Sequence, residues 1–148
     1  MLGVAVFTEN ATLFDHAVLF WQQRLPAYFY LHTDGPEPVP SPRGGTTWHG
    51  QTVFNASLDG LCQETCRDLG HTQMGLAAAL NGAETAWLQG VDLYAQERTR
   101  ITTAMEFHAR LVRVLLMKKK KKNEGGQEQR WTYEPNTVLC VRSVSCLH

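Results

Sequence analysis

Four titratable residues at helical spacing are the part of this chain best suited to chemistry. Glu64, Arg67, Asp68 and His71 occur at positions i, i+3, i+4 and i+7, a spacing that places side chains on one face of a helix. An arginine can neutralise a carboxylate or phosphate, and a histidine can transfer protons near neutral pH. The pattern therefore indicates a site for an anionic substrate, with Glu64 and Asp68 holding the other two side chains in place.

Two other interpretations of this segment remain open. An ion-pair network that pins one helix to its neighbours would explain the same spacing, because buried charges must be paired. A zinc site would use Cys62, Cys66 and His71, but this spacing matches no standard pattern and no fourth ligand is evident. The sequence therefore predicts neither a metal nor a cofactor.

Polar residues in the following apolar stretches are candidates of a second kind. Tyr94 follows Gln89 and Asp92 in an otherwise apolar segment, where its hydroxyl either satisfies a hydrogen bond between helices or acts as a proton donor or acceptor. Arg100 and Glu106 are six residues apart and do not share a helix face well. Their positions alone therefore favour a structural role.

Helices must position these residues, because the apolar pattern has a helical period through most of the chain. Pro26 and Gly82 are expected to end or interrupt helices, and four prolines within residues 36–42 exclude helix interior there. The periodicity predicts helices over residues 11–25, 63–80, 83–95 and 99–117. Since no strand alternation accompanies the last three, we expect an all-α body of antiparallel helices joined by short turns.

Lysine usage divides the chain into two parts. All five lysines lie at 118–122, whereas the preceding residues hold seven arginines and eleven acidic residues. We therefore predict a helical domain over 9–117 and an unrelated, irregular tail over 118–148, in which residues 138–147 are mildly strand-like. The lysine run has no interleaved aromatic residues, so a solvated tail is favoured over a nucleic-acid or lipid site.

The remaining features concern location. No stretch approaches the roughly 18 apolar residues that cross a membrane, so no membrane partner is expected. Residues 1–7 are apolar but lack a preceding basic residue, so they do not form a convincing signal peptide, and the chain is either not secreted or lacks its true start. Asn10 and Asn55 begin glycosylation-type patterns, which hint weakly at secretion.

Three blocks in a fixed order carry a family resemblance. They are Cys62 to Gly75 (CQETCRDLGHTQMG), Ala86 to Tyr94 (AWLQGVDLY), and the segment from Arg100-Ile101 to Glu106. Together they resemble the alginate lyase domain of polyuronate lyases, over roughly residues 9–112. That family shows an acidic-x-x-Arg-Asp-x-Gly-His-Thr block, a Trp-x-Gln-Gly-x-Asp-Leu-Tyr block and a short Arg-to-Glu segment.

The resemblance implies both a fold and an activity. The fold would be an α/α toroid of paired helices, and the activity would be β-elimination on an anionic uronic-acid polysaccharide, outside the cell or in the periplasm. By position in the motifs, the catalytic residues would be Arg67, His71 and Tyr94. The substrate-binding residues would be Glu64, Gln73 and Arg100.

Departures from the family pattern keep a second function open. Family members are commonly more than twice as long, no match follows Met117, and Phe107 stands where relatives often have tyrosine. The chain thus resembles an N-terminal or middle piece of a lyase, with an incomplete barrel of antiparallel helix pairs. The alternative is a catalytically inactive carbohydrate-binding or helical scaffold fragment.

Overall fold

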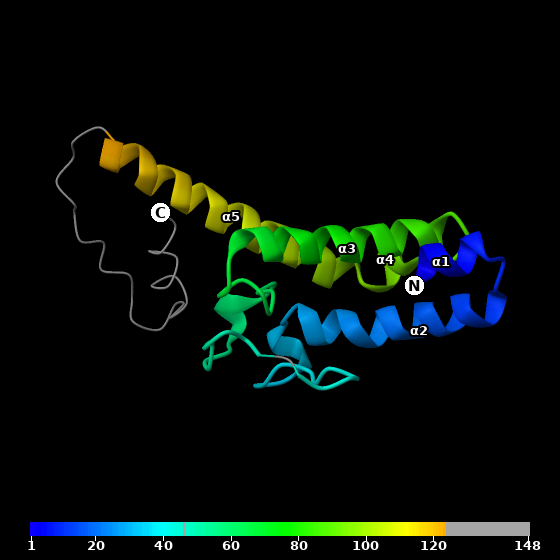
Figure 1. The fold of residues 1–148 in the computed structure, drawn as a ribbon. Helices are drawn as coiled ribbons and strands as arrows, with labels where there is room; N and C mark the ends of the chain where they lie inside the picture. Colours follow the sequence, from blue (N-terminus) through cyan, green and yellow to red (C-terminus); the bar gives the residue numbers. More distant parts are fainter. Residues whose placement is uncertain (46, 124–148) are drawn as a thin grey trace.

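Five α-helices make up most of the described part of the chain. The computed structural model describes residues 1–45 and 47–123, with side chains as far as residue 113. The helices are α1 (Leu2–Phe7), α2 (Ala11–Tyr28), α3 (Leu69–Trp87), α4 (Leu93–Gln96) and α5 (Arg98–Asn123) (Figure 1). Within these residues, the only β-type pairing is an isolated antiparallel bridge between Phe29 and Cys62. The predicted all-α class is confirmed, whereas the arrangement does not show a toroid.

Helices α2 and α3 lie side by side in opposite directions, with α1 against both (Figure 1). Large aromatic side chains of α2 fit against glycines of α3. A Cβ atom added at Gly82 would lie 2.7 Å from Trp21, and one at Gly75 would lie 2.4 Å from the ring of Tyr28. The Trp21 indole N–H also donates to the Ala79 carbonyl at 3.1 Å. The two glycines therefore permit the close approach of the helices.

Pro26 and Gly82 do not end helices, contrary to expectation. Helix α2 continues through Pro26 to Tyr28, because this proline lies in the last turn and costs only one backbone hydrogen bond there. Burial of the neighbouring Ala27 and Phe29 favours the continued turn. Helix α3 continues through Gly82, where the missing side chain makes room for Trp21.

The predicted helix over residues 83–95 is also wrong. Helix α3 ends at Trp87, and Gly90 adopts a left-handed φ of 84° in the turn that follows. Asp92 then caps the short helix α4, its side chain accepting a hydrogen bond from the Ala95 amide at 2.8 Å. The left-handed Gly90 and the N-cap Asp92 together divide the segment that the apolar pattern predicted as one helix.

Helix α3 starts six residues later than the predicted 63–80. Asp68 is its N-cap, and its carboxylate accepts a hydrogen bond from the His71 amide at 2.8 Å. Residues 63–67 form turns instead, and Gln63 donates its backbone amide hydrogen to the Tyr28 carbonyl at 2.9 Å. Glu64, Arg67 and Asp68 thus precede the helix, so the prediction of one four-residue helix face is wrong.

The long connection between α2 and α3 packs against α5. Tyr30, Leu58 and Leu61 form a second apolar cluster with Phe107 of α5. Gly60 has a φ of 88°, and a Cβ atom there would lie 2.4 Å from the Thr103 carbonyl oxygen. Only glycine fits this contact without strain. The connection is therefore a packed part of the fold that can position side chains.

Helix α5 confirms the helix predicted over 99–117. It continues through the lysine run to Asn123, so the prediction of an irregular tail is wrong for residues 118–123. The rest of the predicted tail, including the strand-like segment 138–147, lies outside the described residues, and the domain boundary after residue 117 stays a prediction. None of the helices among the described residues is both long and apolar enough to cross a membrane.

Buried His108 gives the fold a predicted dependence on pH. Its Nδ1–H donates to the Ala104 carbonyl at 2.7 Å, so Nε2 accepts from the Thr65 hydroxyl at 2.8 Å. Burial lowers the pKa of His108 from its ordinary 6.5. The unfolded chain therefore binds this proton more readily, and the free energy of unfolding should decrease as the pH falls below about 6.5.

The test is chemical denaturation of the native chain and of His108→Gln between about pH 8 and pH 5. The variant should lose stability less steeply on the acid side, since it has no imidazole to protonate. His16→Gln is the matched control, because His16 is exposed on α2. Equal acid-side slopes for the native chain and His108→Gln would contradict the prediction.

Candidate active site

A cluster of charged side chains lies at the start of α3. Its members are four residues that are close in sequence, Glu64, Arg67, Asp68 and His71, and His49 from the preceding loop. The Glu64 carboxylate lies 3.5 Å from the Arg67 guanidinium and 3.3 Å from Nε2 of His49. The Arg67 side chain is 48% exposed. Its guanidinium therefore keeps donors free for an anion from solution.

Asp68 and His71 form the second pair of this cluster. Asp68 Oδ2 lies 2.6 Å from Nδ1 of His71, while Oδ1 accepts the His71 amide hydrogen. The backbone hydrogen bond, the largest influence, and the imidazole lower the pKa of Asp68. An ionised Asp68 accepts the hydrogen on Nδ1, so in the neutral imidazole Nε2 is the nitrogen without a hydrogen. This nitrogen has no partner among the described residues, so the imidazole can accept a proton there.

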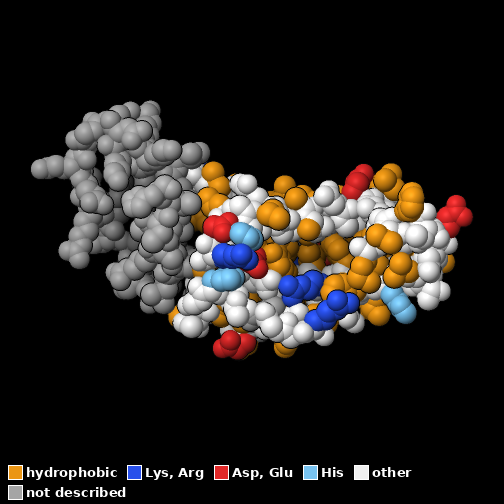
Figure 2. Space-filling view, viewed as in Figure 1, with side chains coloured by type: hydrophobic (Ala, Val, Ile, Leu, Met, Phe, Trp, Pro, Cys, Tyr) orange, Lys and Arg blue, Asp and Glu red, His pale blue; other side chains and the backbone are white. Residues whose placement is uncertain are grey.

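Figure 2 shows acidic, basic and histidine side chains gathered at the end of the molecule where α3 begins, beside a face rich in hydrophobic side chains. The cluster combines two carboxylates with one arginine and two histidines, and the histidine side chains are 30% and 40% exposed. Such a surface can bind an anion and exchange protons with it at the same place.

Tyr28 approaches the same part of α3 from the end of α2. Its hydroxyl lies against Gly75, one turn after His71. Burial, followed by the nearby Cys62 and Glu64, raises the pKa of Tyr28. The phenol is therefore protonated near neutral pH, and its hydroxyl can donate a hydrogen bond.

The structure does not bring the remaining predicted residues to this cluster. The Tyr94 hydroxyl lies 3.2 Å from both the Leu80 carbonyl and the Glu84 carboxylate. Leu80 is nine residues after His71, which is about 13 Å along a helix. Gln73 is exposed, but it lies more than half a turn around α3 from His71.

Arg100 has a different environment, since its side chain is only 8% exposed. It donates twice to the Asp34 carboxylate, at 2.7 and 2.8 Å, and also to the Phe29 carbonyl at 2.9 Å. A further hydrogen bond joins its Nε to Glu97 at 3.1 Å. These contacts occupy the guanidinium and fasten the loop after α2 to α5.

A metal centre has no support among the described residues. No group of three or more histidine, cysteine, aspartate or glutamate side chains there is arranged to hold a metal ion. Cys62 is buried, and burial raises the pKa of its thiol to about 12, which disfavours the thiolate that zinc requires. The zinc interpretation of Cys62, Cys66 and His71 is therefore not supported.

Sequence reasoning missed His49 and Tyr28. His49 has a left-handed φ of 47°, a conformation that is uncommon outside glycine. Both residues lie far from Glu64 in the chain and reach it only through packing of the long connection. No local spacing could have identified them.

Comparison with known proteins gives no relative for this chain: no family model, no curated protein and no solved structure matches it.

Proposed function

We propose that this chain acts on an anionic polysaccharide as a polyuronate lyase, cleaving alginate or a related uronic-acid polymer by β-elimination. The observation that carries the proposal is the Asp68–His71 pair beside the exposed Arg67. A free imidazole nitrogen and a cationic group at one place are what this reaction needs. The motif order that resembles the alginate lyase domain supports the same reaction.

The proposed chemistry begins with the uronate carboxylate. Arg67 binds and neutralises it, which makes the proton on the adjacent C5 more acidic. His71 removes that proton through Nε2, and Asp68 stabilises the imidazolium that forms. The C4–O4 bond then breaks as the C4–C5 double bond forms. O4 takes up a proton from the solvent, to which the His71 imidazolium returns the proton that it removed. Glu64, 3.5 Å from the Arg67 guanidinium, orients that side chain.

The proposed fold is a section of an α/α toroid. Antiparallel neighbours such as α2 and α3 are the unit from which a ring of helix pairs is built. Large apolar side chains on the outer faces, including Met74 at 68% exposure and Leu88 at 71% exposure, support further helices packing there. In that arrangement the start of α3 would lie at one rim of the ring.

Arg67→Gln tests the binding role directly. Loss of the cationic partner should raise the KM for a polyuronate about tenfold or more, because charge-assisted hydrogen bonds contribute roughly 1.5–3 kcal/mol. The rate is followed by the ultraviolet absorbance of the unsaturated uronate product. Arg110→Gln is the matched control, since Arg110 is exposed on α5. An unchanged KM for Arg67→Gln would contradict the assigned role.

A second candidate is a carbohydrate-binding domain without catalysis. The position of Tyr94 favours this candidate. Its hydroxyl lies at Leu80, about 13 Å along α3 from His71, so the two residues predicted to transfer protons, His71 and Tyr94, do not lie at one place. This candidate predicts retention of the chain on immobilised polyuronate without any unsaturated product. Product formation excludes it.

A further inference from the structure

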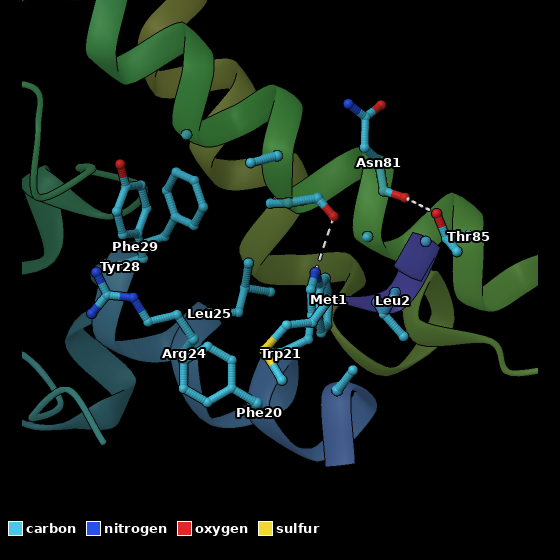
Figure 3. A pocket seen from close by; sticks show the side chains of 16 residues that line it. Met1, Leu2, Phe20, Trp21, Arg24, Leu25, Tyr28, Phe29, Asn81 and Thr85 are labelled. Atoms are coloured by element: carbon cyan, nitrogen blue, oxygen red, sulfur yellow. Dashed lines mark hydrogen bonds between the residues drawn. The ribbon is translucent and has the colours of Figure 1, made fainter. Parts of the chain in front are cut away.

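An apolar cavity lies between α1, α2 and α3, separate from the charged cluster. Its volume is about 480 Å³, within the roughly 300–1,000 Å³ typical of small-molecule sites. Figure 3 shows its lining side chains. Most are apolar, among them Leu2, Ala17, Trp21, Leu25, Ala78 and Ala79.

Two polar groups of this wall are already satisfied by the protein itself. The Trp21 indole N–H donates to the Ala79 carbonyl, and the Thr85 hydroxyl donates to the Asn81 carbonyl at 2.8 Å. The Asn81 side chain points away from the cavity in Figure 3. A sugar bound here would leave most hydroxyls without hydrogen bonds, at a free-energy cost for each. The wall therefore favours an apolar ligand.

Arg24 supplies a cationic guanidinium at the edge of the cavity. Its guanidinium lies 5.3 Å from the centre of the Tyr28 ring and donates to the Ser41 hydroxyl at 2.7 Å. Neighbouring Arg43 lies over the Phe20 ring at 4.6 Å. Neither arginine has a carboxylate partner among the described residues, whereas Arg67 and Arg100 do. Arg24, which lines the cavity, thus offers a guanidinium without an anion beside an apolar space.

We propose that this cavity binds an amphipathic monocarboxylate, with its hydrocarbon part between α2 and α3 and its carboxylate on Arg24. The ligand class follows from charge complementarity at one end and from the mainly apolar lining elsewhere. Such a ligand differs from a uronate polymer, so this site does not depend on the proposed lyase activity.

Titration calorimetry with decanoate is the first test. Decanoate should bind saturably to one site. Decanol, which has the same chain without the charge, should bind with an affinity about tenfold lower, or should not bind. Arg24→Gln should reduce the affinity for decanoate to that for decanol, because a charge-assisted hydrogen bond is lost. Arg110→Gln should bind decanoate as the native chain does.

The location is tested by filling the cavity. Ala78 is exposed on α3 and lines the cavity, whereas its neighbour Ala77 is equally exposed and does not. Ala78→Phe should abolish decanoate binding, and Ala77→Phe should retain it, with both variants shown by circular dichroism to be as helical as the native chain. The proposal is overturned if decanoate does not bind, if decanol binds as tightly, or if Ala78→Phe binds decanoate unchanged.

Discussion

Arg100→Leu should lower the free energy of unfolding by about 3–5 kcal/mol, the range measured when one partner of a buried ion pair is removed. The leucine would leave Asp34, whose side chain is 16% exposed, without its two hydrogen bonds. The Phe29 carbonyl would also lose its Arg100 partner. Chemical denaturation followed by circular dichroism measures the change.

Two control variants make this prediction specific. Arg110→Leu removes an exposed arginine from the same helix and should change stability by less than about 0.5 kcal/mol. The double variant Arg100→Leu with Asp34→Leu should recover part of the lost stability, because no uncompensated aspartate remains. A single variant as stable as the native chain would show that this ion pair does not hold the loop to α5.

His71→Ala should reduce the rate of β-elimination by roughly 10²–10⁴-fold, the contribution typical of a positioned general base. The fold should survive, because the imidazole is 40% exposed and the cap bond to Asp68 comes from the backbone amide. The measurement combines initial rates from product absorbance with a thermal unfolding curve for the same preparation.

His16→Ala serves as the control for His71→Ala, since His16 is an exposed histidine on α2 and lies outside the cluster. It should retain the native rate. If His71→Ala retains the native rate as well, His71 is not the base. If it unfolds instead, the Asp68–His71 pair is a structural feature of the helix start.

Strong local periodicity predicted part of the fold correctly. The apolar pattern of residues 99–117 gave a helix that the structure contains within α5, and the start of α2 was also placed correctly. Helix ends were predicted less well, because tertiary contacts decided them. Helix α3 continues through Gly82, a residue that alone favours an interruption, because Trp21 packs against it.

The start of α3 shows why the site was predicted only in part. The bridge between Phe29 and Cys62 holds the preceding segment in turns, and no local pattern reveals such a distant pairing. The aspartate at the N-cap was a readable signal, since Asp is a favoured residue there.

Two of the three ion pairs of the cluster, Glu64–Arg67 and Asp68–His71, nevertheless form as the spacing indicated. In each pair the partners are three residues apart, and both a turn and a helical first turn bring such residues together. His49 and Tyr28 could not be predicted, because their positions depend on how the long connection folds.

We propose that the charged cluster at the start of α3 catalyses β-elimination on a polyuronate. The most direct measurement is the ultraviolet absorbance of the purified chain with alginate, polymannuronate, polyguluronate and glucuronan, beside the same panel with His71→Ala. We predict an absorbance rise on at least one polymer that the variant lacks. No rise on any polymer, from protein shown to be helical and soluble, would contradict the claim and favour a binding domain without catalysis.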